Sequence, residues 1–151
     1  MKIKHSLSKT LTFTALSIAL VSGFASSASA EDDKRVYVEM PGMMQEHQLG
    51  NMRDHLMAIN EILEEMGKGE LDKAADIAEA RLGMSSLGLH GASHIAKVIP
   101  KDMGAIGTSM HKAASRFALK AQEGDALPAY KALQEVTAAC VACHAGYKTH
   151  K

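Results

Sequence analysis

The 151-residue chain has no tryptophan and only three tyrosines and three phenylalanines, so aromatic side chains cannot fill most of a core. Methionine is abundant instead, with ten residues, and its flexible side chain packs into irregular spaces and leaves room for a bulky guest. The 17 basic and 17 acidic residues balance, which argues against the basic surface of a nucleic-acid-binding protein. Both cysteines lie within four residues of each other near the C-terminus.

Long hydrophobic runs are also missing, apart from one near the N-terminus. Three lysines within the first nine residues precede an apolar run over residues 11–21, and a small-residue Ala-Ser-Ala sequence ends at Ala30. The run is about half of the ~20 residues that a membrane crossing needs. This order predicts a signal peptide over residues 1–30, cleaved after Ala30, and export to the periplasm without a membrane anchor. Removing its three lysines leaves 14 basic against 17 acidic residues, a mildly acidic mature chain.

Residues 31–151 have the length of one domain with its own core. Apolar residues recur at helical spacing, and the pattern predicts four helices, over about 41–66, 70–84, 102–123 and 125–147. The second helix is predicted to fade over residues 85–88, and residues 89–100 are predicted to form a crossover loop. The predicted fold is therefore all-α, an antiparallel four-helix bundle whose facing helices can enclose a cofactor.

Helix ends and one apolar row complete this prediction. Asp102 and Asp125 are predicted N-caps of the third and fourth helices. The sequence Gly67-Lys68-Gly69 is predicted to end the first helix, and Gly124 the third. The first helix is predicted to bury a row spaced by three and four residues: Leu49, Met52, Leu56, Ile59, Leu63 and Met66.

The sequence CVACH, residues 140–144, falls on the last turns of the fourth predicted helix. CxxCH is the attachment sequence for c-type haem. Positions three and four apart share one helical face, so the sulfurs of Cys140 and Cys143 can both reach one porphyrin edge. His144 then lies under the ring, where an imidazole nitrogen can bind the iron. Thioether formation also removes two thiols that would be a liability in an oxidising compartment.

Three other interpretations compete. A redox CxxC pair needs a helix N-terminus and a thioredoxin-like βαβ unit, which the helical pattern does not provide. A structural zinc site needs a fourth ligand beside Cys140, Cys143 and His144, such as His90, His94 or His150. A disulfide between neighbouring turns closes a very short loop and stabilises little.

The chain resembles the cytochrome c-prime family, the class II c-type cytochromes, over the whole of residues 31–151. CVACHAGYK matches the family pattern CxxCHxxY followed by a basic residue, and Lys148 stands where the family often has arginine. The resemblance implies one covalently bound haem c on the C-terminal helix. It implies thioether bonds at Cys140 and Cys143 and proximal iron ligation by His144.

The resemblance also places the distal side of the iron against the first helix, where family members carry either a methionine ligand or an apolar cover. Met52 is the favoured distal ligand, because its thioether is a competent axial ligand that raises the reduction potential. Met44 is the next candidate. Leu49 at this position would instead leave an open, gas-binding site.

The remaining histidines are not predicted ligands. His55 is predicted to flank the apolar row at the surface or the haem edge, and His111 to lie at the border of the third helix. His47 is expected on the first helix, while His90 and His94 are expected in the crossover loop, where a metal site is disfavoured. His150 belongs to the terminal tail.

The predicted function is that of a periplasmic monohaem cytochrome that carries one electron between transient redox partner proteins and is not an enzyme. The alternative is a five-coordinate haem protein that binds nitric oxide or carbon monoxide. The family resemblance further suggests a homodimer through helices one and two, for which Met57 and Ile62 are candidate contacts.

Overall fold

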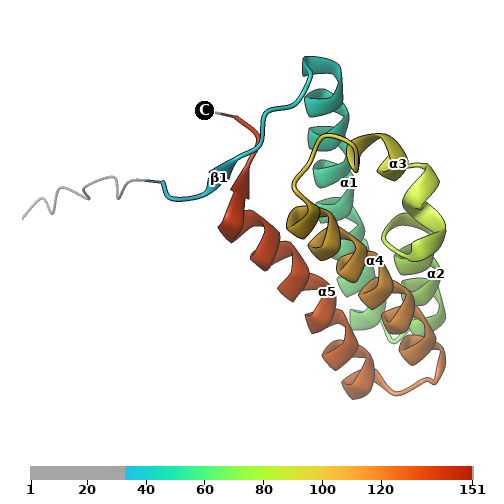
Figure 1. Cartoon of the computed structure of the whole chain (residues 1–151). Helices are drawn as coiled ribbons and strands as arrows, with labels where there is room; N and C mark the ends of the chain where they lie inside the picture. Colours follow the sequence, from blue (N-terminus) through green and yellow to red (C-terminus); the bar gives the residue numbers. More distant parts are fainter. Residues whose placement is uncertain (1–32, 151) are drawn as a thin grey trace, which may run out of the picture. The chain divides into compact units, whose positions relative to one another are not determined.

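The computed structural model describes residues 33–150, so the predicted signal peptide over residues 1–30 lies outside the described residues. The described residues are mostly helical with little strand, as Figure 1 shows, which confirms the all-α prediction. Its elements are β1 (Val36–Tyr37), α1 (Gly42–Gly67), α2 (Leu71–Arg81), a 3₁₀ helix η1 (Met84–Gly88), α3 (Ala92–Ile95), α4 (Lys101–Gln122), α5 (Ala126–Gly146) and β2 (Tyr147–Lys148).

Most helix ends follow the predicted residues. Gly69 and Gly124 adopt positive φ angles of 79° and 81° just after α1 and α4, a conformation that costs glycine little. The Asp125 side chain caps α5 by accepting a hydrogen bond from the Leu127 N–H at 3.1 Å. Asp102 was wrongly predicted as an N-cap. Pro100 takes that position because its fixed φ suits the residue that enters the helix, and Asp102 lies in the first turn.

The predicted crossover loop over residues 89–100 is wrong in part, because α3 forms within it. The 3₁₀ helix η1 comes just before it, where the second helix was predicted to fade. Ser86 is fully buried, and its hydroxyl donates a hydrogen bond to the Gly83 carbonyl at 2.7 Å. Gly91 has a φ of 61° and allows the chain to turn into α3. The 3₁₀ helix η1 packs against α2, α4 and α3, which fixes this segment on the rest of the fold.

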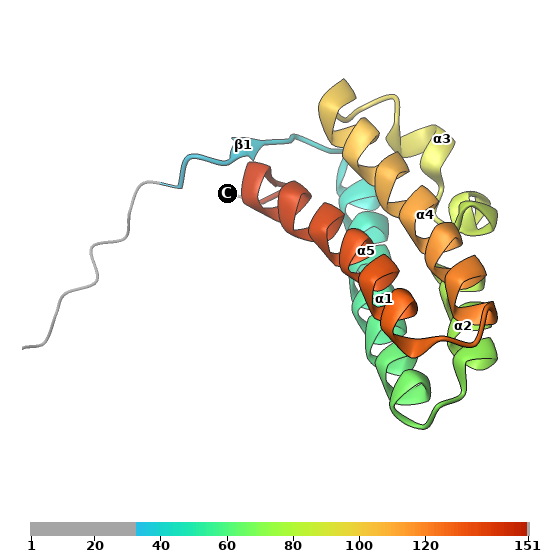
Figure 2. The same ribbon diagram turned by 90° about the horizontal axis from the view of Figure 1, so that it is seen from below.

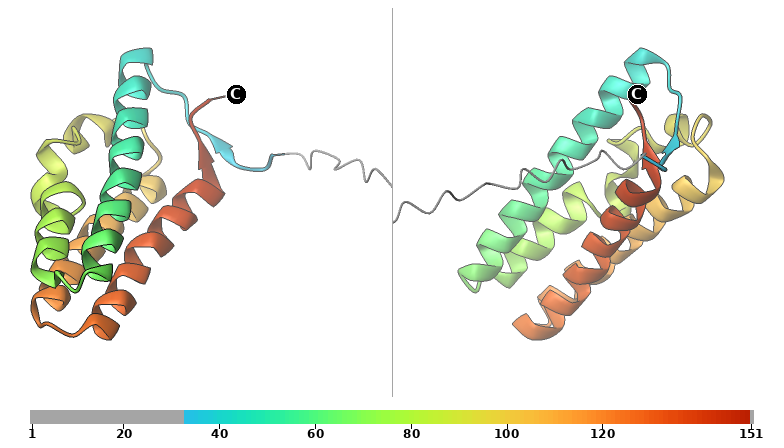
Figure 3. Two further views of the ribbon diagram at one scale, coloured as in Figure 1. Left: turned by 180° about the vertical axis from the view of Figure 1, so that it is seen from behind. Right: turned by 90° about the vertical axis from the view of Figure 1, so that its left-hand side faces the viewer.

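The long helices pack in chain order, with α1 against α2, α2 against α4, and α4 against α5. Figures 1 and 2 show α4 and α5 side by side. In Figure 3, α5 diverges from α1 toward its C-terminal end. None of the helices within residues 33–150 combines the length and apolarity that a membrane crossing needs.

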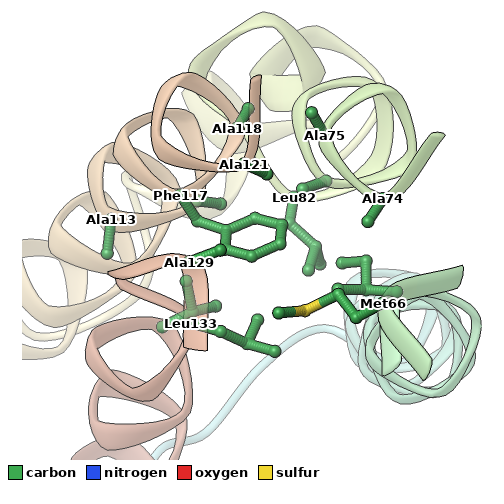
Figure 4. Packing of buried hydrophobic residues seen from close by; sticks show 14 of the residues in the cluster. Met66, Ala74, Ala75, Leu82, Ala113, Phe117, Ala118, Ala121, Ala129 and Leu133 are labelled. Atoms are coloured by element: carbon green, nitrogen blue, oxygen red, sulfur yellow. The ribbon is translucent and has the colours of Figure 1, made fainter. Parts of the chain in front are cut away.

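The core lies where α1, α2, α4 and α5 meet. Phe117 is fully buried, and Figure 4 shows its ring between Leu82, Leu133 and Met66. The other buried positions around it are mainly alanines of α2, α4 and α5: Ala74, Ala75, Ala78, Ala113, Ala114, Ala118, Ala121 and Ala129. Such small side chains let the helix backbones approach closely at this end of the molecule.

The predicted apolar row of α1 is only partly correct. The residues that α1 buries are His55, Ala58, Ile62 and Met66. Leu56 and Leu63 are instead 73% and 45% exposed. The reason is that α1 packs through the neighbouring row, where an alanine allows closer contact with α2. Ile62 is fully buried, so it is not available for the dimer contact expected of it, whereas Met57 is exposed.

The segment before α1 pairs with the segment after α5. Strands β1 and β2 are parallel, with Val36 opposite Tyr147 and Tyr37 opposite Lys148. The Val38 N–H donates a hydrogen bond to the Lys148 carbonyl at 2.8 Å, and the Lys148 ammonium lies 3.2 Å from Asp33. These contacts hold the C-terminal end of α5 in place.

Replacement of Phe117 by alanine should lower the free energy of unfolding by about 3–5 kcal/mol, because it leaves a cavity at the centre of the core. Denaturant unfolding followed by circular dichroism measures the loss. Leu119→Ala on the same helix, at a side chain that is 66% exposed, is the control and should change stability by less than about 0.5 kcal/mol. Equal losses for the two variants would contradict this description of the core.

Candidate functional site

Cys140, Cys143 and His144 lie on the last two turns of α5, as the sequence predicts. Cys140 packs against the main core, whereas Cys143 packs against a second, smaller cluster formed by Val38, Met40 and Met103. The two thiols are thus held on one face of α5 between two apolar clusters, and both are free.

A cavity of about 330 Å³ adjoins this face of α5. This volume falls within the range of pockets that hold small molecules and cofactors, about 300–1,000 Å³. Cys140, Cys143 and His144 form part of its wall. The rest of the wall is mainly apolar, and its larger apolar residues from the other elements are Met52, Leu56, Ile59, Leu82, Leu87, Ile95, Ile99, Met103, Ile106 and Met110.

Burial raises the pKa of both thiols, and the neighbouring Cys140 raises that of Cys143 further. A raised pKa disfavours the thiolate, which is the species that carries out disulfide exchange. The C-terminal end of a helix carries a partial negative charge, so the location of both cysteines near the end of α5 also disfavours the thiolate. The site therefore does not have the properties of a redox dithiol.

His144 is exposed and is one of the residues that line the cavity. Its backbone carbonyl accepts a hydrogen bond from the Arg35 guanidinium at 3.4 Å, so the segment before α1 contacts the motif directly. Gln45 of α1 donates a hydrogen bond to the Thr149 carbonyl a few residues later. Contacts from Arg35, just before β1, and from α1 therefore hold the chain on both sides of residue 147.

Of the residues nominated for the distal side, Met52 lines the cavity and is half-buried. Leu49 is not part of the cavity wall. Met44 packs against the smaller cluster and, with His47 and His94, lines a separate pocket of about 340 Å³. The structure thus brings Met52 to the same cavity as the CVACH residues and separates Met44 and Leu49 from it.

Three buried histidines form a cluster at the same cavity. The sequence analysis did not predict this cluster. His55 of α1, His90 between η1 and α3, and His111 of α4 are all at least 91% buried and all line the cavity. Their ring centroids are 4.6 Å apart for His55 and His90, 5.3 Å for His90 and His111, and 6.1 Å for His55 and His111. The predictions of a surface position for His55 and a border position for His111 are therefore wrong.

Two members of this histidine cluster are anchored to the protein. The Nδ1–H of His111 donates a hydrogen bond to the Leu82 carbonyl at 2.7 Å, and His90 Nδ1 lies 3.4 Å from the Ser86 hydroxyl oxygen. The Nε2 atom of His55 is different. Among the described residues it is the one buried side-chain nitrogen or oxygen without a hydrogen-bond partner.

Burial favours the uncharged form of two members of the cluster, His55 and His90, because it lowers the pKa of each. Loss of solvation, followed by the proximity of His90 and His111, lowers the pKa of His55 to about 4. Burial, followed by the proximity of His111, lowers the pKa of His90 as well. Asp54, which would favour a charged imidazole nearby, is itself paired with Arg81.

The zinc interpretation gains no support from the geometry. Within residues 33–150, no group of three or more histidine, cysteine, aspartate or glutamate side chains is arranged to hold a metal ion. His94 and His150, two of the three nominated fourth ligands, are exposed, and neither forms part of the cavity wall.

The sequence did contain one signal that His55 is buried: its spacing from Ala58 in the first helix. These residues begin a row at positions 55, 58, 62 and 66 that runs parallel to the leucine-rich row. No sequence signal predicts that His90 and His111 lie beside His55, because their positions depend on how the elements pack.

No family model matches the chain, and neither a curated protein nor a solved structure matches it. The functional conclusions below therefore depend on the residues and geometry of the site.

The lowered pKa of His55 predicts an acid-sensitive fold. The unfolded chain binds a proton at His55 below its ordinary pKa of 6.5, whereas the folded chain does so only near pH 4. The free energy of unfolding should therefore fall as the pH falls from about 6.5 to 4, and His55→Leu should reduce this slope. Denaturant unfolding at several pH values measures it, with His94→Leu as the exposed control. An unchanged slope in His55→Leu would contradict the assignment.

Proposed function

We propose that this protein is a periplasmic monohaem c-type cytochrome that carries one electron between redox partners and is not an enzyme. Its fold would be the antiparallel four-helix bundle of the cytochrome c-prime family. One observation carries the proposal: Cys140, Cys143 and His144 share one face of α5 and line a single, mainly apolar cavity. CxxCH residues in such a setting are those of covalent haem attachment.

The residues at the cavity suit haem c. Both thiols are free and face an apolar space, where thioether bonds to a porphyrin would consume them. His144 is adjacent to the second cysteine and is exposed at the cavity wall, where its imidazole can serve as the proximal iron ligand. The iron of a bound haem c supplies the chemistry, since it exchanges one electron between its ferric and ferrous states.

The protein holds the proposed site rigidly. The α5 helix is fixed by the core at one end and by the β1–β2 pair at the other. Cys143 also packs against the cluster of Val38, Met40 and Met103. A site on well-packed helices changes little on electron transfer, and this property suits a carrier. The apolar wall excludes water, which together with the axial ligands and nearby charge tunes the potential.

A ligand from α1 would complete the coordination of a dedicated electron carrier. Met52, predicted from the sequence, lines the cavity from α1. Its thioether would give six-coordinate, low-spin iron.

The gas-binding alternative is supported by Leu56 and Ile59, which belong to the same wall. If these apolar side chains cover the iron instead, the site is open to nitric oxide or carbon monoxide.

Redox partners would dock transiently near the exposed part of the motif. Val141, between the two cysteines, is 68% exposed, and Tyr37 of β1 is 39% exposed. Contacts of this kind are small and partly polar. A homodimer through α1 and α2 would use Met57 and Leu63, which are exposed on α1, and not Ile62.

Haem attachment can be tested with cysteine variants expressed in the periplasm of a host with cytochrome maturation. The wild-type protein should retain Soret absorption after denaturation and acid–acetone extraction, because thioether bonds survive this treatment. The Cys140→Ala/Cys143→Ala variant should lose it. Haem that is extracted equally from both proteins would contradict covalent attachment.

The absorption spectrum separates the carrier from the gas-binding alternative. A carrier with two axial ligands should be low-spin in both oxidation states, and carbon monoxide should change the reduced spectrum little within the mixing time. A high-spin protein that binds carbon monoxide at once would support the gas-binding function instead. The reduced protein with and without carbon monoxide provides the comparison.

A further inference from the structure

A second pocket, of about 340 Å³, lies between the start of α1 and the segment around α3, apart from the cavity of the CVACH residues. Four of the residues that line it carry a side-chain sulfur or nitrogen that can bind a metal ion: Met43, Met44, His47 and His94. The proposed haem site uses none of them. The second pocket therefore has a chemistry of its own.

Three of these four residues come from one side of α1. Met43 and His47 are four positions apart, and Met44 and His47 are three apart, so their side chains are neighbours on the helix surface. Met44 is half-buried and packs against the smaller apolar cluster, whereas Met43 is 86% exposed. One thioether is thus anchored to the protein, and the other can close over an ion in the pocket.

The His47 ring reaches from α1 to the segment that carries His94. Its Nε2 atom lies 3.0 Å from the point that a Cβ atom on Gly91 would occupy, so the missing side chain of this glycine leaves room for the ring. His94 follows one turn later, and its N–H donates a hydrogen bond to the Gly91 carbonyl at 2.9 Å. The two imidazoles therefore approach one pocket from two different elements.

The structure separates His94 from His90, although the two are only four positions apart in the sequence. His90 is buried at the cavity of the CVACH residues, whereas His94 is exposed and lines the second pocket. His94 thus shares its pocket with the metal-binding side chains of α1 and not with His90.

The donor atoms select one class of metal ion. Thioether and imidazole ligands suit copper, and thioethers select its Cu(I) state. Calcium and magnesium need oxygen ligands, and none of the described residues that line this pocket is acidic. Structural zinc sites need four ligands from cysteine, histidine and carboxylate, and two histidines are too few. The partial positive charge at the N-terminal end of α1 also disfavours a divalent ion more than a monovalent one.

We propose that Met43, Met44, His47 and His94 form a binding site for Cu(I). Half of its ligands are methionines, which agrees with the lack, within residues 33–150, of any metal-binding group of three histidine, cysteine or carboxylate side chains. Met43, His47 and His94 are exposed, so an ion can enter from the solvent while the core stays folded. Copper binding at this pocket does not depend on haem attachment at α5.

Competition between the exported protein and a chromogenic Cu(I) chelator, without oxygen and with ascorbate present, tests the site. The wild type should bind one Cu(I) ion that Met43→Leu/Met44→Leu does not bind. His47→Gln and His94→Gln should each weaken this binding by at least ~10-fold, since loss of an outer-shell partner alone has that effect on metal affinity. Met84→Leu and His150→Gln, at an exposed methionine and an exposed histidine outside the pocket, are the controls and should bind Cu(I) as the wild type does.

Copper binding and haem attachment have separate readouts. Soret absorption reports the haem. Thiols left free without haem would add the same Cu(I) binding to the wild type and to all these variants, so the difference between them reports the pocket in either case. Equal Cu(I) binding by the wild type and the three site variants would overturn the proposal, as would an equal loss in the controls. Circular dichroism checks that each variant folds, and the two exposed histidine variants decide the question if the methionine variant does not.

Discussion

The fixed position of the C-terminal end of α5 is the constraint on which the proposed site depends. Cys140, Cys143 and His144 share a helical face only while α5 remains helical up to Gly146. Core packing of Leu133 and Val136 secures the middle of the helix. Beyond it, the pairing of β1 with β2 and the contacts of Arg35 and Gln45 secure the chain that follows.

The unusual composition of the core explains why a cavity exists beside this helix. Around Phe117, alanines let α2, α4 and α5 pack closely, and the interior there is filled. Toward the other end, α5 diverges from α1, as Figure 3 shows, and flexible or small side chains such as Met52, Met103, Gly104 and Gly107 line the space that remains. The scarcity of aromatic residues and the abundance of methionine thus both serve the formation of an apolar cavity.

Much of the fold was predictable because it depends on local signals. The glycines after α1 and α4 and the Asp125 cap were identified correctly, since each acts through its own backbone conformation or side chain. The buried row of α1 was not. Its apolar face is wide enough for two rows, and only tertiary contacts decide that Ala58 and Ile62 enter the core while Leu56 lines the cavity.

The site shows the same division between local and tertiary information. The positions of Cys140, Cys143 and His144 on one helix follow from their spacing. The histidine cluster of His55, His90 and His111 brings together α1, α4 and the turn between η1 and α3, and this turn lies in the segment predicted to be a loop. The central claim is a covalent haem on α5. The intact mass of the exported protein under denaturing conditions tests it most directly. We predict the mass of residues 31–151 plus one haem, and the mass of the polypeptide alone would contradict the account.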